Sequence, residues 1–491
     1  MKRTAVTLVV AAAALLARPL CARAAGPAAA EPQVLGYQVD VSRDKVPTRA
    51  SLHRIVDVLS SLGYNQLQLY VEHTFAYPRH EAVWAEASPL TPEDVRELDA
   101  YAAERGIELV PNQNSLGHLE NWLCHPEYNA LAELGEGGAV MPSWGNAVMA
   151  RSRSLCPTDP RALEFVAGLY DELLPCFRSR WLNVGCDEPI ELLDPSCRGR
   201  SGDELRAKGE GRVYLDWLLK IHRLAAERHH RIMFWGDVIL RHPEFVPEIP
   251  EDVVCLDWGY EANHPFEREA ALFADSGRRF LVCPGTSAWR SISGRLGNMT
   301  NNVAAAVAAG RRHGALGILL SDWGDEGHAN PFIVSLPALV YTALRARGEE
   351  VSRARLAREL DRVLGCASGE ALLDYGDVYE AAGVRPHNRS EVFSWLRGEK
   401  LDQADDEHRA AVLAAVARAQ AKVDLEGAPD WVRDGFATLE LLYRALALRF
   451  QEPDKVNFRA VFEPEYRRLW LRHNRRGGLA DSLTRIFGPL K

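Results

Sequence analysis

From about residue 34 to residue 346, the chain alternates between short apolar runs and longer amphipathic segments. A short continuous apolar run is typical of a strand buried on both faces, whereas apolar residues three and four positions apart are typical of a helix packed on a sheet. We expect strands at Leu35–Val41, Asn65–Val71, Ile107–Pro111, Trp181–Val184, Ile232–Trp235, Val253–Trp258, Phe280–Cys283 and Gly317–Leu320.

The segments between these runs carry helical spacing and helix-end signals. Thr91 precedes Pro92 and two acids, and Gly63 and Gly106 follow expected helix ends. The expected helices are Arg49–Leu62, Pro92–Arg105, Arg161–Leu174, Val213–Arg228, Phe266–Ala274, Asn302–Arg312 and Pro331–Leu344, with a weaker one at Pro243–Val246. Eight strand–helix units predict an α/β fold, a (β/α)8 TIM barrel over residues 32–347. A doubly wound sheet is the alternative, but it usually has a glycine-rich turn after the first strand, which is absent here.

Beyond about residue 350 the apolar runs stop, and the pattern changes to charged, alanine-rich helical segments. These segments are Ala354–Leu364, His408–Ala421, Trp431–Phe450 and Pro464–Arg472. We therefore expect an all-helical C-terminal domain over residues 350–491 after the barrel.

The first residues have the features of a leader segment. Lys2 and Arg3 are followed by an apolar stretch to Leu16 and by Ala-Arg-Ala at residues 22–24. This order is typical of a secretory signal peptide, here residues 1–24. The apolar stretch is too short to cross about 30 Å of hydrocarbon, and no later segment reaches membrane-spanning length. We expect an exported protein, periplasmic or extracellular, without a membrane span.

Composition narrows the classes of function. With 47% apolar and 25% charged residues the chain is typical of globular proteins, and its formal charge of −9 argues against a nucleic-acid partner. Export would permit disulfides, and Cys124–Cys156 is the pair that we expect to be bridged. The cysteine and histidine spacing suggests no metal site, and the acidic stretch 322–328 fits a mobile loop better, so we expect neither metal nor cofactor.

In a barrel of this type, catalytic side chains come from the C-terminal ends of the strands. The expected fifth, sixth and eighth strands end at or just before Trp235, Trp258 and Trp323. Indole is costly to expose and is common at binding surfaces, so tryptophans beside carboxylates favour a sugar site, although each could instead fill a barrel layer. Asp40 and Arg43 follow the first strand, where they could form a buried ion pair or contact substrate.

The sharpest chemical feature is the pair Asp187-Glu188 at the end of the expected fourth strand. Adjacent carboxylates on an extended chain point in different directions, so one could orient the substrate while the other protonates a leaving group. An isolated Asp-Glu pair is usually a solvated turn, but its position at a strand end makes catalysis the better interpretation. Substrate-assisted glycosidases need this division of labour, because the sugar's own 2-acetamido oxygen attacks the anomeric carbon.

Several segments resemble one enzyme family. Residues 183–188, Asn-Val-Gly-Cys-Asp-Glu, resemble the Gly-x-Asp-Glu signature of family 20 glycoside hydrolases, the β-N-acetylhexosaminidases. Residues 39–43 resemble the family's first-strand Asp-Val-x-Arg, and residues 109–118 resemble its third-strand segment ending in Gly-His. Residues 70–77 resemble the Glu-x-x-Phe-x-Tyr pattern of the hexosaminidase D branch. The resemblance covers roughly residues 34–346.

The resemblance implies an exo-acting β-N-acetylhexosaminidase that acts on an N-acetylhexosamine-containing glycan or glycoconjugate. Glu188 would be the general acid/base, and Asp187 would orient and stabilise the 2-acetamido group through a retaining, oxazolinium-forming reaction. Substrate-binding roles are implied for Glu72, His118, Trp235, Asp237, Trp258, Tyr260, Trp323 and Asp325. The resemblance implies no cofactor and leaves an oligomer possible.

Structural roles are the alternative for some of these residues. His118 could be a hydrogen-bonded structural histidine, and Asp237, after a Trp-Gly turn, could cap the following segment. For Tyr260, by contrast, the resemblance implies a hydrogen bond to the acetamido oxygen of the substrate.

Two positions depart from the family pattern. Leu35 stands where many members carry an arginine, and His73 stands where the related branch more often has an acid. These departures keep open a catalytically silent carbohydrate-binding barrel. A third hypothesis is a two-carboxylate retaining glycosidase with Asp237 or Asp325 as the nucleophile, which would place a carboxyl about 5–5.5 Å from the acid.

Overall fold

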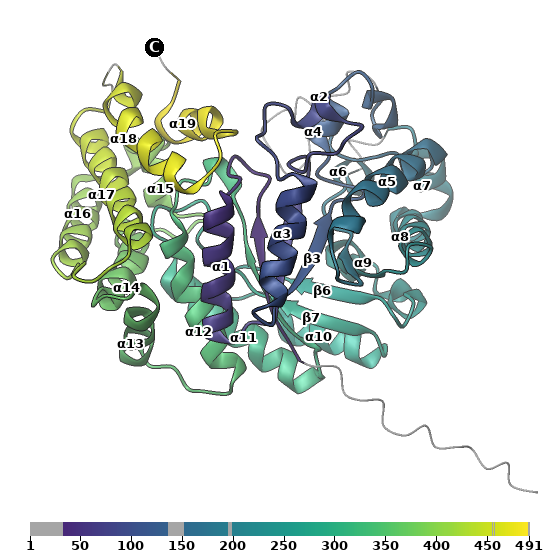
Figure 1. Ribbon diagram of the computed structural model, residues 1–491, viewed down its shortest axis with the longest axis horizontal. Helices are drawn as coiled ribbons and strands as arrows, with labels where there is room; N and C mark the ends of the chain where they lie inside the picture. Colours follow the sequence, from purple (N-terminus) through teal and green to yellow (C-terminus); the bar gives the residue numbers. More distant parts are fainter. Residues whose placement is uncertain (1–32, 136–151, 195–198, 454, 456, 490–491) are drawn as a thin grey trace, which may run out of the picture. The chain divides into compact units, whose positions relative to one another are not determined.

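Figure 1 shows the computed structural model, which describes residues 33–135, 152–194, 199–453, 455 and 457–489. The chain from Val34 onward forms one compact unit. The expected signal peptide, residues 1–24, lies outside the described residues.

Among the described residues, eight parallel strands close a barrel in chain order, which confirms the expected TIM barrel. The strands are β1 (Val34–Asp40), β2 (Gln66–Val71), β3 (Glu108–Gln113), β4 (Trp181–Asn183), β5 (Arg231–Trp235), β6 (Val254–Trp258), β7 (Arg279–Cys283) and β8 (Gly317–Asp322). The barrel closes because β1 pairs on one side with β2, in the register Gly36 to Gln66, and on the other with β8, in the register Val34 to Gly317.

Helices surround the barrel (Figure 1). They are α1 (Arg49–Leu62), α2 (Glu81–Trp84), α3 (Pro92–Ala103), α4 (Glu120–Leu123), α5 (Pro160–Leu173), α6 (Ile190–Leu193), α7 (Gly202–Lys208), α8 (Glu210–Ala226), α9 (Asp237–Arg241), α10 (Phe266–Asp275), α11 (Leu296–His313) and α12 (Leu336–Ala346). The caps are those that the sequence signals: Thr91 and Asp94 form a reciprocal capping box on α3, and Gly63 ends α1 with a φ of 84°.

Some helix boundaries differ from expectation. The weak helix expected at Pro243–Val246 is a 3-10 helix over Pro243–Glu248. The segment before the last barrel helix also starts as a 3-10 helix, over Phe332–Ser335, and α12 begins at Leu336 with a proline in its first turn. Because proline has no backbone N–H to donate, the change from the 3-10 helix to α12 sacrifices no hydrogen bond from that residue.

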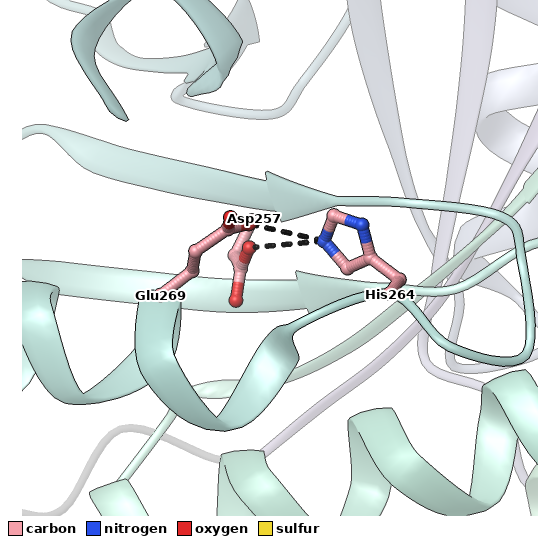
Figure 2. Close-up of side chains that lie close together, drawn as sticks. All are labelled: Asp257, His264 and Glu269. Carbon is pink, nitrogen blue, oxygen red and sulfur yellow. Dashed lines mark ion pairs between the residues drawn. The ribbon is translucent and has the colours of Figure 1, made fainter. Parts of the chain in front are cut away.

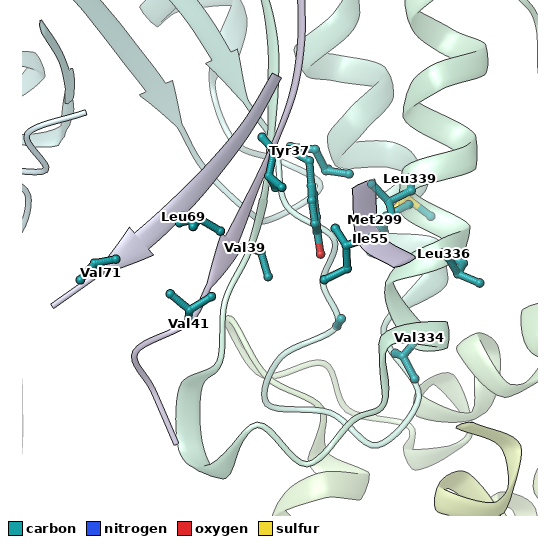
Figure 3. Packing of buried hydrophobic residues seen from close by; sticks show 14 of the residues in the cluster. Tyr37, Val39, Val41, Ile55, Leu69, Val71, Met299, Val334, Leu336 and Leu339 are labelled. Carbon is teal, nitrogen blue, oxygen red and sulfur yellow. The ribbon is translucent and has the colours of Figure 1, made fainter. Parts of the chain in front are cut away.

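Apolar side chains form separate clusters on the two sides of the strands. Outward-facing residues such as Tyr37, Val39 and Val41 pack against the helices, as Figure 3 shows. A smaller cluster inside the barrel contains Met233 and Leu256 together with tryptophans at the strand ends. Because side chains alternate along a strand, one sequence supplies both clusters.

Among the described residues after the barrel, the regular elements are helices, with short 3-10 turns between some of them. The α-helices are α13 (Arg353–Leu364), α14 (Gly369–Asp377), α15 (Glu391–Leu396), α16 (Asp406–Gln420), α17 (Asp430–Gln451), α18 (Phe458–His473) and α19 (Leu479–Phe487). They pack directly on the barrel side: α14 contacts α11, and α19 contacts the turn Asp325–Gly327 after β8. Ser293, in the loop after β7, hydrogen-bonds Tyr443 of α17.

The expected disulfide between Cys124 and Cys156 is wrong, because both cysteines are free. Cys124 is exposed, whereas the thiol of buried Cys156 contacts the hydroxyl of Thr158. Across the described parts of the chain, we find no helix that combines the length and the apolar character needed to cross a bilayer.

Candidate active site

A pocket enclosing about 440 Å³ opens at the C-terminal ends of the strands. Its lining has two parts. The charged wall consists of Arg43, His118, Asp187, Glu188 and Asp325, and the aromatic wall consists of Trp235, Trp258, Tyr260, Trp289 and Trp323, with Asn388 at its edge.

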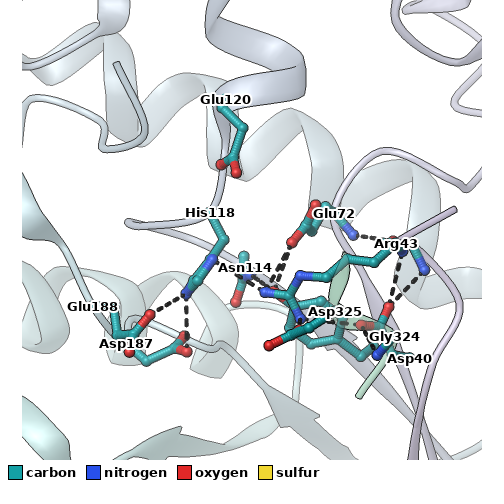
Figure 4. A network of polar contacts seen from close by, with 12 residues as sticks. Asp40, Arg43, Glu72, Asn114, His118, Glu120, Asp187, Glu188, Gly324 and Asp325 are labelled. Carbon is teal, nitrogen blue, oxygen red and sulfur yellow. Dashed lines mark hydrogen bonds and ion pairs between the residues drawn. The ribbon is translucent and has the colours of Figure 1, made fainter. Parts of the chain in front are cut away.

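The charged wall is organised around His118 (Figure 4). Its Nε2 lies 3.2 Å from Oδ2 of Asp187 and 3.5 Å from Oε2 of Glu188. On the other side of the ring, Nη2 of Arg153 donates to Nδ1 at 2.7 Å. Because a guanidinium only donates, Nδ1 accepts, and the ring proton lies on Nε2, where it faces the two carboxylates.

Opposed effects set the pKa values of Asp187 and His118. Burial alone would raise the pKa of Asp187, but the imidazole outweighs burial and holds the pKa below its usual value. Burial also disfavours the imidazolium, yet the charge of Asp187 raises the pKa of His118, against the opposing charges of Arg153 and Arg43. Asp187 is therefore an anion at neutral pH, and its buried Oδ1 has no hydrogen-bond partner among the described residues.

The backbone after β4 brings the two carboxylates together. The φ values are 64° at Gly185, 66° at Cys186 and 44° at Glu188. The chain is therefore left-handed at these positions and not extended, contrary to the expectation from the sequence. This left-handed turn directs Asp187 and its neighbour toward the same imidazole. A Cβ on Gly185 would lie 1.8 Å from Oδ1 of Asn114, so only glycine fits where the loops after β3 and β4 meet. Backbone strain of this kind is concentrated at functional sites.

Arg43 lies between several acids, and the ion pair with Asp40 that the sequence suggested is present, with Nη1 and Oδ2 3.0 Å apart. The same guanidinium approaches Oε1 of Glu72 at 3.4 Å and Oδ1 of Asp325 at 3.5 Å. It also lines the pocket, so the ion pair and the position for substrate contact occur together. Glu72 lies behind it, accepts from the hydroxyl of Tyr70 at 2.9 Å, and has its pKa raised by burial to about 7.

The aromatic wall is held by ring packing. Trp258 and Tyr260 stack with their centroids 5.1 Å apart, and Tyr260 meets Trp289 edge to face at 5.0 Å. The indole N–H groups of Trp235 and Trp323 are buried and have no partner among the described residues. A sugar ring can stack on the flat apolar faces of these side chains, and its oxygen atoms can accept hydrogen bonds from the unused indole N–H groups.

Asp237 links the two walls from behind the pocket. Its Oδ2 accepts from the backbone N–H of Glu188 at 3.2 Å, and its Oδ1 accepts from Nε1 of Trp258 at 3.5 Å. Burial, together with the charges of Asp187 and Glu188, raises the pKa of Asp237 to about 7. Because Asp237 holds both the loop that carries Glu188 and the indole of Trp258, it can position the two.

Most of the residues expected from the sequence meet in this pocket: Asp187, Glu188, His118, Trp235, Trp258, Tyr260, Trp323 and Asp325 all line it. Glu72 and Asp237 are not part of its lining. Sequence reasoning missed Trp289 and Asn388 as lining residues. A signal existed for Trp289, which follows the seventh strand, but none for Asn388.

Asn388 comes from the chain after the barrel. Its Oδ1 accepts from Nε1 of Trp289 at 3.0 Å, and its backbone N–H donates to Oε1 of Glu261 at 2.8 Å. Nearby, Glu326 after β8 pairs with Arg290 of the barrel and with Arg397 just after α15. The helical region is thus fixed to the strand ends and contributes to the pocket edge.

A larger cavity of about 890 Å³ lies between the barrel and helices α17 and α18. Its lining is mostly apolar, and burial lowers the pKa of Lys45 in it to about 7. Asp40 reaches its lining, but Asp187, Glu188 and the expected tryptophans do not, so the smaller pocket is the candidate active site.

Comparisons with known proteins point to one family. Residues 35–292 match the sequence profile described as glycosyl hydrolase family 20, catalytic domain. A β-hexosaminidase of Emericella nidulans is 27% identical over 45% of this chain, and hexosaminidase D of Bos taurus is 24% identical over 59% of it. The match spans 39% of the length of the first relative and 84% of the second. The crystal structure of a Flavobacterium johnsoniae chitobiase superposes with a TM-score of 0.53 at 14% identity, over 92% of this chain and 77% of that one, which supports the fold.

Proposed function

This chain belongs to glycosyl hydrolase family 20, and from that premise we propose that it is an exo-acting β-N-acetylhexosaminidase using the substrate's own acetamido group as nucleophile. The observation that carries the proposal is the pairing of Asp187 and Glu188 around one imidazole, opposite an aromatic wall. The substrate would be a glycan or glycoconjugate with a terminal N-acetylhexosamine.

Asp187 has the properties needed to orient the acetamido group. It is ionised, and its Oδ1 has no hydrogen-bond partner in the part of the chain that the structure describes, so the amide N–H of a bound sugar can donate to it. That hydrogen bond turns the amide carbonyl oxygen toward the anomeric carbon. As a carbonyl oxygen–carbon bond forms, positive charge develops on the ring that results, and the Asp187 carboxylate stabilises that charge.

Glu188 is placed for proton transfer. Its side chain is 48% exposed, so it reaches the open side of the pocket, where a leaving group would lie. In the first step Glu188 protonates the glycosidic oxygen while the bond from that oxygen to the anomeric carbon breaks. In the second step Glu188 takes a proton from water, which attacks the same carbon, reopens the oxazolinium and restores the acetamido group with retained configuration.

The aromatic wall supplies binding and shape. Trp258 and Tyr260 present ring faces to a sugar, and the free indole donors of Trp235 and Trp323 can pair with its hydroxyl or carbonyl oxygens. A buried donor left without a partner is costly, so a sugar lacking the matching acceptor would bind less well.

The test compares paired aryl β-glycosides, one with and one without the 2-acetamido group, with the wild type, Asp187→Asn and Glu188→Gln. We expect cleavage only of the acetamido sugar, reduced about 10²–10⁴-fold in kcat in both variants. Asp203→Asn, on the exposed surface, is the control that keeps full activity.

Equal cleavage of both sugars would overturn the acetamido mechanism and favour a two-carboxylate enzyme. Cleavage of neither, with binding of N-acetylhexosamine retained, would favour a silent carbohydrate-binding barrel. We also propose that the reaction takes place after export, as residues 1–24 predict. Fractionation of cells that express the full chain tests this, and activity confined to the cytoplasm would contradict it.

A further inference from the structure

A second group of ionisable side chains, drawn in Figure 2, comes from β6, from α10 and from the loop between them. Asp257 is the residue of β6 before Trp258, His264 follows in the loop, and Glu269 is in the first turn of α10. The side chain of Asp257 is fully buried, and that of His264 is 19% exposed. Because Leu256 belongs to the cluster inside the barrel, alternation places Asp257 on the outer face of β6, toward α10.

The nitrogen and oxygen atoms at the ends of the three side chains lie close together, but they leave hydrogen-bonding capacity unused. Nε2 of His264 lies 3.1 Å from Oε2 of Glu269 and 3.9 Å from Oδ1 of Asp257. Yet Nε2 and both carboxylate oxygens of Asp257 are buried and make no hydrogen bond within the described chain. A buried carboxylate without any donor is among the least favourable arrangements in a protein interior. Apart from the long ion pair of Oδ1 with His264, the two oxygens of Asp257 have no partner among the described residues, which points to a ligand that supplies positive charge.

We propose that Asp257, His264 and Glu269 bind a divalent transition-metal ion, for which Zn²⁺ is the expected occupant. One atom from each residue lies within 4.8 Å of the others. Zinc binds imidazole nitrogen and carboxylate oxygen at about 2.0–2.2 Å, so tetrahedral ligand atoms stand roughly 3.3–3.5 Å apart and a small closure completes the set. The two carboxylates, of Asp257 and Glu269, balance the charge of the ion.

The chemistry of the donors selects against other common ions. Calcium and magnesium prefer sets made only of oxygen atoms, whereas imidazole favours zinc and its neighbours in the first transition series. Arg268 donates to Oε1 of Glu269 at 2.8 Å, which leaves Oε2 for the ion.

The histidine ring is also held in place by its surroundings. A Cβ on Gly259 would lie 2.0 Å from Nδ1 of His264, so backbone packs against the ring at that point. The side chain of Asn302 in turn donates to the carbonyl of Gly259 at 2.9 Å. Support of this kind around a ligand is typical of metal sites, because it fixes the orientation of the ring.

The position of the site indicates what the metal does. Asp257 and His264 bracket the loop that carries Trp258 and Tyr260, two members of the aromatic wall. An ion bound to both ends of this loop, and through Glu269 to α10, would fix the loop against the barrel. The metal is therefore structural: it lies behind the pocket and touches no substrate. The sequence alone predicts no metal here, because the spacing of these ligands matches none of the common metal motifs.

The experiment measures zinc binding by the full chain, independently of glycosidase activity. Protein stripped with a chelator and then titrated with Zn²⁺ alone should bind one equivalent by calorimetry, confirmed by elemental analysis after gel filtration. Zinc should raise the Tm of the wild type. His264→Ala should lose the tight site, and Asp257→Asn should weaken it by at least about tenfold.

The matched control is His242→Ala. His242 also lies beside two carboxylates, Glu210 at 3.3 Å and Glu244 at 3.7 Å, but outside the proposed site. This variant should bind zinc as the wild type does. Tight binding that survives His264→Ala, or is lost equally in the control, would overturn the assignment.

A second measurement needs no variant and so does not depend on how the variants fold. X-ray absorption at the zinc edge of the loaded wild type should show one imidazole and otherwise oxygen ligands. A spectrum without imidazole would overturn the site. So would the absence of tight zinc in the wild type, since His264 would then only share a proton with the two carboxylates.

Discussion

The two walls of the pocket are built by different physical means. The charged wall is held by ion pairs around Arg43 and His118 and by left-handed backbone on both sides of Asp187. The aromatic wall is held by ring stacking that continues into the apolar cluster inside the barrel. The charged wall depends on each partner being present, because burial penalises any charge left alone. The aromatic wall depends on the shape and the buried area of its rings, to which many neighbouring side chains contribute.

This contrast predicts that single substitutions in the charged wall mainly lower kcat, whereas those in the aromatic wall mainly raise KM. Three changes, from the largest expected effect to the smallest, test the contrast.

The largest effect is expected from His118→Ala. The substitution removes the imidazole that holds the pKa of Asp187 down, so burial acts unopposed and that pKa rises. We expect kcat to fall about 10²-fold and the acid limb of the kcat/KM profile to move to higher pH. His118→Gln, which keeps a donor toward Asp187, should recover part of the activity. An acid limb that does not move in His118→Ala would show that the imidazole does not control Asp187.

A smaller effect is expected from Trp258→Ala in the aromatic wall. Loss of one stacked face removes about 1–1.5 kcal/mol of ring interaction, so kcat/KM should fall about tenfold, mostly through KM. Trp181→Ala is the matched control, because Trp181 is also half-buried but starts β4 at the opposite end of the barrel, under Arg231. A control that raises KM equally would mean that loss of stability, and not loss of the wall, causes the effect.

The smallest effect on kcat/KM is expected from Asp237→Asn, at the residue that joins the two walls, because this substitution mainly changes the pH dependence of stability. With the pKa of Asp237 raised to about 7, the folded state keeps a proton that the unfolded chain releases near pH 4. The folded state thus binds more protons between about pH 4 and pH 7, and stability falls as pH rises through that window. The variant should lose less stability there, by about 2–4 kcal/mol.

The measurement is Tm against pH for both proteins. The variant should retain the part of the slope that comes from Glu72, whose pKa burial raises to about 7. Parallel curves for the two proteins would contradict the assignment of the proton to Asp237.

The sequence predicted the barrel well because strand periodicity is local. The expected run Trp181–Val184 differs from β4 by one residue at its end, and the tryptophans that follow strands do gather in one pocket. The divergent geometry expected for Asp187 and Glu188 failed because it assumed an extended chain, whereas left-handed φ values decide their direction. Such values at Cys186 and Glu188 are imposed by contacts with other loops, which no local pattern records.

Contacts between segments that are far apart in the sequence could not be predicted either. Asn388 stands about a hundred positions after Trp289, in a stretch without strands, and nothing in its neighbours signals a pocket. The cluster of Asp257, His264 and Glu269 has irregular spacing, and only the packing of α10 on β6 brings its atoms together.

The reach of Asn388 over the aromatic wall has a consequence for protein engineering. In the sequence, residue 347 resembles a domain boundary at which the barrel could be excised or fused to another domain. A barrel cut there would lose Asn388 from its rim and Arg397, the partner of Glu326, so its binding cleft would be left unfinished. Recombination of this scaffold therefore has to transfer the whole of residues 34–489 as one cassette.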